Sequence, residues 1–233
     1  MFLLLSKKVY FCPLQLKLAT KDMENTKFII TINREFGSGG HEIARKLSEL
    51  LDVKFYDKTF LATIREKFNL TEEEAEKIKA EKTNWWSEFC RFYQQFGIAT
   101  TYIQQPLEVT SQQLYYAEAK ALRDLAEHES CIVVGRSGFH VFKDTPDTVK
   151  IFLIADMEHR VKRIMEKYKV DEKEARKLID DIDKARENYT KTFAGKSRYD
   201  ARNYDFVINV TPFTTDQVAQ FLAYNLRLKY KTK

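Results

Sequence analysis

The sequence predicts an α/β fold in which a five-stranded parallel sheet is covered by helices on both faces. Five short runs of apolar and β-branched residues read as strands, at 28–32, 53–56, 131–134, 149–154 and 206–210. Four of these runs are nearly continuous in apolar residues, which is typical of a parallel strand that is buried on both faces. Helical patterns separate the runs, and strands that alternate with helices indicate βαβ units.

The predicted helices are marked by their spacing and by their start signals. Residues 41–51 repeat apolar side chains at the spacing of an amphipathic helix. Asp171, with Glu174 three residues on, marks a helix start, and apolar residues follow at helical spacing as far as Tyr189. Residues 216–228 form the expected closing helix.

One insertion and one extension depart from this alternation. Residues 57–129 form a long, almost wholly helical insertion between the second and third strands. We expect residues 23–233 to form a single domain. Residues 1–22 precede Met23 and a clean strand, and we interpret them as an upstream extension that is non-native or disordered.

Composition narrows the class of protein. The chain has 233 residues, 44% hydrophobic and 31% charged, and a net charge of +5 that suits an anionic ligand or a solvated basic surface. Its three cysteines, Cys12, Cys90 and Cys131, form no C-x-x-C pair, so we expect neither a disulfide framework nor a zinc site. We therefore expect a cytoplasmic protein. No stretch approaches the roughly 20 apolar residues of a membrane span, so we expect no membrane partner.

A glycine-rich turn follows the first strand. The chain has seven glycines, and three of them stand at Gly37, Gly39 and Gly40, just before the first predicted helix. Backbone N–H groups in such a turn can close on an anion without obstruction by a Cβ, and the helix N-terminus adds partial positive charge. Ser38 adds a hydroxyl, and His41 could donate to a phosphate. A flexible turn and an exposed histidine are the alternatives to this predicted phosphate-binding loop.

The turn departs from the standard phosphate-binding pattern G-x-x-x-x-G-K-[ST]. If Gly39 is the second glycine, Arg34 stands in place of the first glycine. Gly40 then stands in place of the lysine that reaches the β- and γ-phosphates. Another cation must replace that lysine, and the candidates are Arg34, His41 and Lys58.

The residues around this turn resemble the opening of the cytidylate kinase-like family, a branch of the P-loop nucleoside monophosphate kinases. Residues 30–43 read Ile-Thr-Ile-Asn-Arg-Glu-Phe-Gly-Ser-Gly-Gly-His-Glu-Ile and carry the Arg-Glu-x-Gly-Ser-Gly-Gly string of that branch. The similarity covers roughly residues 27–210 and is poor over 65–125. It continues at Phe-Tyr-Asp-Lys (55–58), Val-Val-Gly-Arg-Ser (133–137), 149–154 with Arg160 and Arg163 following, and 204–209.

The resemblance implies a three-layer P-loop NTPase fold. Its helical insertion, residues 57–129, would bind the nucleoside monophosphate, and residues 171–203 would form a helical lid. The implied reaction transfers the γ-phosphoryl group of ATP, with Mg²⁺, to a nucleoside monophosphate, with CMP or dCMP as the first guess. The expected partners are therefore nucleotide substrates.

Site residues carry over from the resemblance by position. Residues 37–41 would hold the donor phosphates together with Arg34. The acceptor would be bound by Asp57, Gly135 and Arg136. Arg136 would also be catalytic, as would Arg186, the lid arginine that stabilises charge during transfer.

Ordinary structural roles remain open for both arginines. Arg136 could be a salt-bridged arginine at a strand end, and Arg186 could pair with Asp183 one turn back on its helix. The metal ligands are unknown, and Ser38 and Glu42 are guesses.

The sequence also departs from true cytidylate kinases. Of their acceptor motif Asp-x-Gly-x-x-Tyr-Arg only Asp57 is present, and Ser137 replaces the aspartate of Gly-Arg-Asp. The lid's Arg-Asp pair reads Ile179-Asp180. These departures leave the acceptor open, and with the missing lysine they favour an alternative: a nucleotide-binding P-loop protein with weak or no kinase activity.

A third class of function, a nucleic-acid or assembly factor, rests on two further features. Residues 85–96 carry aromatic side chains on one helical face, which indicates core packing, a base-stacking surface or a homodimer contact. Lys196, Arg198 and Arg202 form a basic loop that suits a closing lid or is simply solvated. Because the aromatic helix carries only Arg91 as a cation, we do not expect nucleic acid as a partner.

Overall fold

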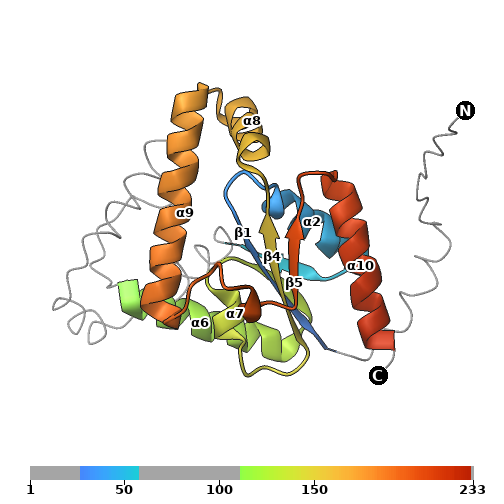
Figure 1. The fold of residues 1–233 in the computed structure, drawn as a ribbon. Helices are drawn as coiled ribbons and strands as arrows, with labels where there is room; N and C mark the ends of the chain where they lie inside the picture. The colour runs from blue at the N-terminus through green and yellow to red at the C-terminus, as the bar shows by residue number, and fades with distance from the viewer. Residues whose placement is uncertain (1–26, 58–110, 232–233) are drawn as a thin grey trace, which may run out of the picture.

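The computed structural model describes residues 27–57 and 111–231, which form a single five-stranded sheet with flanking helices (Figure 1). The strand order is β2-β3-β1-β4-β5, and every pairing is parallel. The predicted fold class, an α/β protein with a five-stranded parallel sheet, is confirmed. The strands are β1 (Ile29–Arg34), β2 (Lys54–Tyr56), β3 (Cys131–Val134), β4 (Thr148–Ile154) and β5 (Phe206–Asn209).

The helices of the described residues follow the predicted alternation. They are α2 (Gly40–Leu51), α6 (Ser111–His128), α7 (Gly138–Val141), α8 (Met157–Tyr168), α9 (Glu172–Ala194), the 3₁₀ helix η3 (Ala201–Asn203) and α10 (Thr215–Lys231). The predicted start of α9 is confirmed, because the Asp171 carboxylate accepts a hydrogen bond from the Glu174 amide at 2.8 Å.

The first strand is longer than predicted, and the difference bears on the site. β1 runs to Arg34 rather than ending at residue 32, because Asn33 and Arg34 pair with Phe152 and Leu153 of β4. Arg34 is therefore fixed in the sheet instead of lying in the turn. The glycine loop, residues 35–39, connects it to α2.

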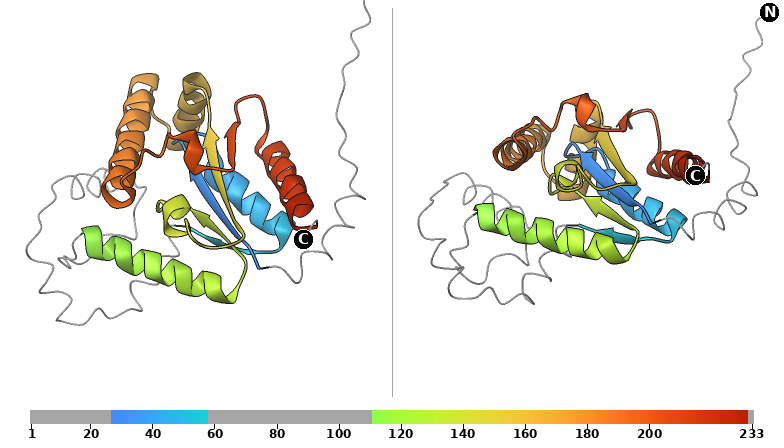
Figure 2. Two further views of the ribbon diagram at one scale, coloured as in Figure 1. Left: turned by 60° about the horizontal axis from the view of Figure 1, so that its bottom comes forward. Right: turned by 90° about the horizontal axis from the view of Figure 1, so that it is seen from below.

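The sheet is buried on both faces, as the continuous apolar strands predict. Ile30 and Ile32 of β1 pack with α2 and α10 on one face. Ile29 of the same strand packs with α6 and α7 on the other face. Figure 2 shows the resulting layers, with α6 on one side of the sheet and α2 and α10 on the other. This layering leaves the carboxyl ends of the strands as the place for a site.

A helical hairpin of α8 and α9 lies at that end of the sheet. In Figure 1 α8 and the first turns of α9 stand at the end toward which the strand arrows point, and α9 continues from there down the side of the sheet. Its apolar cluster takes in Phe36 of the glycine loop together with residues such as Ile164 of α8 and Ile182 of α9. The loop is thus packed directly against the region predicted to act as a lid.

Several expectations fall outside the described residues. They concern residues 1–22, Lys58, the first part of the 57–129 insertion and the aromatic stretch 85–96 with its homodimer alternative. The end of the insertion is helical, as predicted, in α6. In the described ranges no helix combines the length and apolar character needed to cross a bilayer.

Candidate functional site

The glycine loop presents a cluster of backbone amides with no partner in the described chain. Gly37 and Gly39 have left-handed φ angles of 87° and 80°, which a residue with a side chain adopts only under strain. The amides of residues 37 and 39–42 donate to no acceptor among the described residues. We call these five N–H groups the amide cluster. Unpaired amides at a helix N-terminus form a site for an anion such as a phosphate.

Two other amides of the loop are already engaged. The Phe36 amide donates to Asp183 Oδ1 of α9 at 2.9 Å, in a buried hydrogen bond. The Ser38 amide donates to the Glu35 carbonyl oxygen at 3.3 Å, and the Ser38 hydroxyl donates to the same oxygen at 2.9 Å. Ser38 is buried, so its hydroxyl shapes the loop rather than pointing to solvent.

Arginines of α8 fill the space beside two of the loop glycines. A Cβ on Gly37 would lie 2.9 Å from Arg160 Cβ. A Cβ on Gly39 would lie 3.3 Å from the guanidinium carbon of Arg163. The absence of side chains in the loop therefore lets α8 approach it closely and sets the Arg163 guanidinium beside the amide cluster.

Arg34 fills the space beside the third glycine and continues to a second loop. A Cβ on Gly40 would lie 2.7 Å from Arg34 Cβ and 2.8 Å from Arg34 Cγ. A Cβ on Gly135 would lie only 2.3 Å from Arg34 Nη1. The side chain thus runs from the start of α2 to the loop after β3, which joins the predicted donor and acceptor residues.

Asp183 stands at the centre of a buried group of arginines. Its Oδ2 accepts from Arg160 Nη1 at 2.7 Å, and its Oδ1 lies 3.5 Å from both Arg186 Nη1 and Arg198 Nη1. We call Arg160, Arg186 and Arg198 the arginine cluster. The i,i+3 pairing of Arg186 with Asp183, open at the sequence level, is present. It does not remove Arg186 from the site, because the same guanidinium donates to the Arg34 carbonyl oxygen at 3.2 Å.

The arginine cluster carries more positive charge than its carboxylates neutralise. Three guanidinium groups face two carboxylates, those of Asp183 and Glu35. Arg160 Nε is buried, makes no hydrogen bond within the described chain, and lies 3.8 Å from Glu35 Oε2. Burial, and next the neighbouring Arg186 charge, lower the pKa of Arg198. A buried excess of positive charge favours an anionic ligand.

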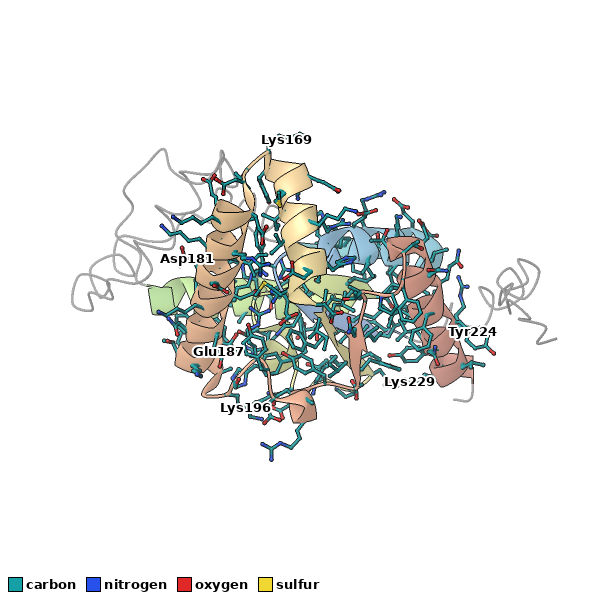
Figure 3. All side chains as sticks on the ribbon, turned by 45° about the horizontal axis from the view of Figure 1, so that its top comes forward. Lys169, Asp181, Glu187, Lys196, Tyr224 and Lys229 are labelled. Carbon is teal, nitrogen blue, oxygen red and sulfur yellow. The ribbon has the colours of Figure 1, made fainter. Side chains whose placement is uncertain are left out.

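The predicted basic loop is therefore split by the structure. Arg198 is only 2% exposed, and its Nη2 donates to the Arg34 carbonyl oxygen. Arg202 is exposed and paired with Asp200, and Lys196 is exposed beyond the end of α9 (Figure 3). The alternative of a solvated basic loop is wrong for Arg198, because a contact across 164 residues holds its side chain in the interior.

Glu42 of α2 is held by cations and a hydroxyl. Its carboxylate accepts from Arg163 Nη2 and from Thr215 Oγ1, and Lys46 Nζ lies 3.2 Å away. The hydrogen bond from Arg163 is the largest cause that lowers the pKa of Glu42 to about 2. Both guessed metal ligands, Ser38 and Glu42, are thus engaged within the protein. No group of three or more potential metal ligands gathers within the described residues.

His41 lies at the other side of the loop and contacts the predicted acceptor side. Its Nε2 is 2.9 Å from Asp57 Oδ2, and its ring packs edge-on against Phe55. The contact joins the first turn of α2 to the end of β2. Asp57 is thereby placed beside the first turn of α2, next to the glycine loop.

Arg136 has a different environment from the other arginines. Residues 135–137 all have positive φ angles, of 82°, 54° and 48°, so the chain turns sharply after β3. Arg136 Nη1 lies 3.3 Å from Glu118 Oε2 of α6, and both side chains are largely buried. The strand-end salt bridge that the sequence left open is present, at the wall between α6 and α9.

A cavity of about 280 Å³ opens on the side of the loop away from Asp57. It lies between α8, the loop after β5 and the start of α10. Its lining includes the buried Ser38 and the guanidinium-bearing Arg163, together with an exposed aromatic ring at Phe213. A cavity with both apolar and polar lining residues beside an anion site suits a nucleobase attached to phosphates.

Comparison with known families identifies the family of this chain. The profile of the cytidylate kinase-like family matches residues 29–212. The chain belongs to the cytidylate kinase-like family. No curated protein matches.

Several solved structures are similar to this cytidylate kinase-like protein over most of its length. An uncharacterised protein from Eubacterium ventriosum is 25% identical with a TM-score of 0.64, over 86% of this chain and 98% of that one. Shikimate kinase from Acinetobacter baumannii is 15% identical with a TM-score of 0.49, over 92% and 99%. Shikimate kinase from Bacteroides thetaiotaomicron is 15% identical with a TM-score of 0.46, over 85% and 98%.

The structure brings most of the predicted site of this kinase-like protein to one place. Arg34 reaches Gly135, His41 reaches Asp57, and Arg186 reaches the end of β1. Arg136 instead contacts α6. Sequence reasoning assigned no role to Asp183 beyond a surface pair, and none to Glu35. Its only signal for Arg160 and Arg163 was the family resemblance.

Proposed function

We propose that this protein transfers the γ-phosphoryl group of ATP to a small acceptor, with CMP and dCMP as the first candidates. The observation that carries the proposal is the amide cluster of residues 37 and 39–42, open at the carboxyl end of a parallel sheet and flanked by arginines. Membership of a kinase-like family supports the reaction class. The acceptor within that class rests on the resemblance alone.

The donor nucleotide would lie across the glycine loop. Its phosphates would accept hydrogen bonds from the amide cluster, and Arg163, beside Gly39, would add charge on the same side. The nucleobase would enter the cavity lined by Phe213. This placement uses the helix N-terminus of α2 as the main anion site.

Magnesium fits the donor set through Asp57 rather than through the usual hydroxyl. His41 stands where the standard loop has Ser or Thr, and a ring nitrogen is not the hard oxygen ligand that Mg²⁺ prefers. The Asp57 carboxylate, which contacts His41, would supply an oxygen ligand, directly or through water. When bound with ATP, Mg²⁺ would neutralise charge on the β- and γ-phosphates.

Transfer of a phosphoryl group needs positioning and positive charge more than covalent chemistry. The arginine cluster meets this need, because it lies at the end of β1 with one guanidinium in excess of its carboxylates. Arg186 is the member of the cluster that we propose as the lid arginine, because its side chain is 19% exposed, against 9% for Arg160 and 2% for Arg198. Exclusion of water by α8 and α9 would strengthen these charges.

The acceptor would bind between Asp57 and the loop after β3. Gly135 lies against the tip of Arg34, so an acceptor there would meet the guanidinium at the side opposite the donor. Arg136 would hold the far end of the acceptor, with Glu118 fixing its guanidinium. We further propose a cytoplasmic location, where ATP is available and the buried thiol of Cys131 stays reduced.

An assay of ADP release across the nucleoside monophosphates tests the proposal. Turnover with one pyrimidine monophosphate, lost in a Gly39→Asp variant whose carboxylate would oppose the phosphates, supports a kinase. Absence of turnover on every acceptor, with ATP still bound, supports the second candidate, a nucleotide-binding protein without transfer. The glycine at position 40, in place of the P-loop lysine, is the observation that favours this second candidate.

A further inference from the structure

We propose that Arg34 supplies the positive charge that a lysine at position 40 supplies in the standard loop, and that it does so from the opposite wall of the site. The inference rests on the proposed function, because it assigns a residue to the binding of the donor phosphates. It also accounts for a glycine at position 40, which the sequence leaves without a reason.

The side chain of Arg34 occupies the space that a lysine would need. A Cβ on residue 40 would lie 2.7 Å from Arg34 Cβ and 2.8 Å from Arg34 Cγ, which is closer than carbon atoms pack. Any side chain at position 40 would therefore displace Arg34. Glycine at 40 leaves the room that the stem of Arg34 occupies, and this chain has a cation at 34 where the standard loop has one at 40.

Arg34 cannot easily turn aside from this position. Its backbone pairs with Leu153 in the sheet. Its carbonyl oxygen accepts hydrogen bonds from Arg186, at 3.2 Å, and from Arg198. Because the strand pairing and these hydrogen bonds hold the backbone of Arg34, its Cα–Cβ bond has a fixed direction. The side chain must therefore pass over Gly40.

The guanidinium then lies between the two substrate positions. Arg34 Nη1 would be 2.3 Å from a Cβ on Gly135, so the tip of the side chain lies on the loop after β3. The stem lies at the N-terminus of α2, beside the amide cluster. A planar guanidinium can bind two oxygen atoms at once, unlike an ammonium group. Placed here, it would contact the γ-phosphate on the side that faces the acceptor.

Of the two other replacements for the lysine that the sequence suggests, His41 lies within the described residues and fits less well. His41 has a side chain that is 57% exposed, and its Nε2 already contacts the carboxylate of Asp57. Its ring packs on Phe55, on the β2 side of the loop. Arg34 is always charged and lies at the centre of the site, so the structure favours it over His41.

The test compares variants that keep or remove the stem. Arg34→Met keeps a stem of similar shape over Gly40 and removes the charge. It should weaken binding of a non-hydrolysable ATP analogue, measured by calorimetry, by about tenfold or more, and lower kcat by about 100-fold or more. Arg176→Ala, which removes an arginine paired with Glu158 and Glu172 on the surface of α9, is the matched control and should leave both quantities unchanged.

A charge relocation provides the sharper result. Gly40→Lys alone should abolish binding of the analogue, because the new side chain collides with Arg34. Arg34→Gly combined with Gly40→Lys should bind the analogue at least tenfold better than Arg34→Gly alone, because only removal of the Cβ at 34 gives the lysine room. Circular dichroism would confirm that each variant folds. A double variant that folds but binds no better than Arg34→Gly alone contradicts the proposal, as does Arg34→Met with unchanged binding.

The outcome also separates this inference from the proposed function. Wild-type protein that binds the analogue but transfers no phosphoryl group contradicts the kinase and leaves the binding comparison to decide the role of Arg34. Wild-type protein that binds no nucleotide overturns both. Wild-type turnover that Arg34→Met retains in full overturns the inference alone.

Discussion

Replacement of Asp183 by alanine should destabilise the fold strongly, although nothing in the local sequence marks this residue as buried. The carboxylate is 7% exposed and accepts hydrogen bonds from the Phe36 amide and from Arg160 Nη1. Its removal would leave a buried guanidinium and a buried amide without their acceptor, and the guanidinium of Arg198 would lose its nearest carboxylate, at 3.5 Å.

The expected loss can be set from these contacts. Removal of one partner of a buried ion pair costs about 3–5 kcal/mol. For a protein of this length, 1 kcal/mol shifts the midpoint of thermal unfolding by about 2–4 °C, so the midpoint should fall by about 6–20 °C. Asp183→Asn should lose less, because its amide oxygen can still accept from Phe36. Asp181→Ala is the matched control: Asp181 lies exposed on the same helix (Figure 3), and surface changes stay within about 0.5 kcal/mol.

Thermal unfolding with and without inorganic phosphate measures both parts of this prediction. The alanine variant has one more uncompensated positive charge in the arginine cluster, so phosphate should raise its midpoint more than that of the wild type. A midpoint for Asp183→Ala within 2 °C of that for Asp181→Ala, a gap of about 1 kcal/mol or less, would refute the account of the cluster. Equal stabilisation of both proteins by phosphate would refute its role as an anion site.

Three further predictions follow from single residues. Gly37→Ala should destabilise the protein by about 1–3 kcal/mol more than Gly195→Ala in urea unfolding. Both glycines have a positive φ, but only at position 37 would an added Cβ lie within 3 Å of Arg160. Equal losses of stability in the two variants would contradict the close approach of α8. Glu42→Gln should lower the midpoint of thermal unfolding near neutral pH, because the pKa of Glu42 falls from 4.5 to about 2 on folding and the charged carboxylate therefore stabilises the fold above about pH 4.5. The difference in midpoint between variant and wild type should vanish as the pH drops toward 2. A difference that stays constant with pH would contradict the Arg163 contact. Burial raises the pKa of the Cys131 thiol to about 12, so in a Cys12→Ser/Cys90→Ser background iodoacetamide should modify it only in denaturant, and modification of the folded protein would show that the thiol is reachable.

The sheet could be predicted because each strand carries its own signal. The run at 131–134 was predicted with the bounds that β3 has, since four apolar residues between Ser130 and Gly135 admit few other structures. The end of β1 could not be predicted from the sequence, because Asn33 and Arg34 are polar. They join the strand only through pairing with β4, more than a hundred residues away.

The position of the glycine loop could be predicted from the sequence, but the contacts between the charged side chains around it could not. The order of strand, glycines and helix places the loop from local sequence. The role of Asp183 depends on contact with Phe36 across 147 residues, and no local pattern distinguishes it from the exposed Asp180 on the same helix. The position of Arg34 over Gly40 could not be predicted either, because the spacing of residues in the sequence does not show in which direction a side chain points.

A structure of the protein with a non-hydrolysable ATP analogue and Mg²⁺ tests the central claim most directly. The phosphates should accept hydrogen bonds from the amides of residues 37 and 39–42, with the Arg34 guanidinium on the γ-phosphate. Phosphates bound elsewhere, or a loop whose amides stay turned away from the bound nucleotide, would contradict it.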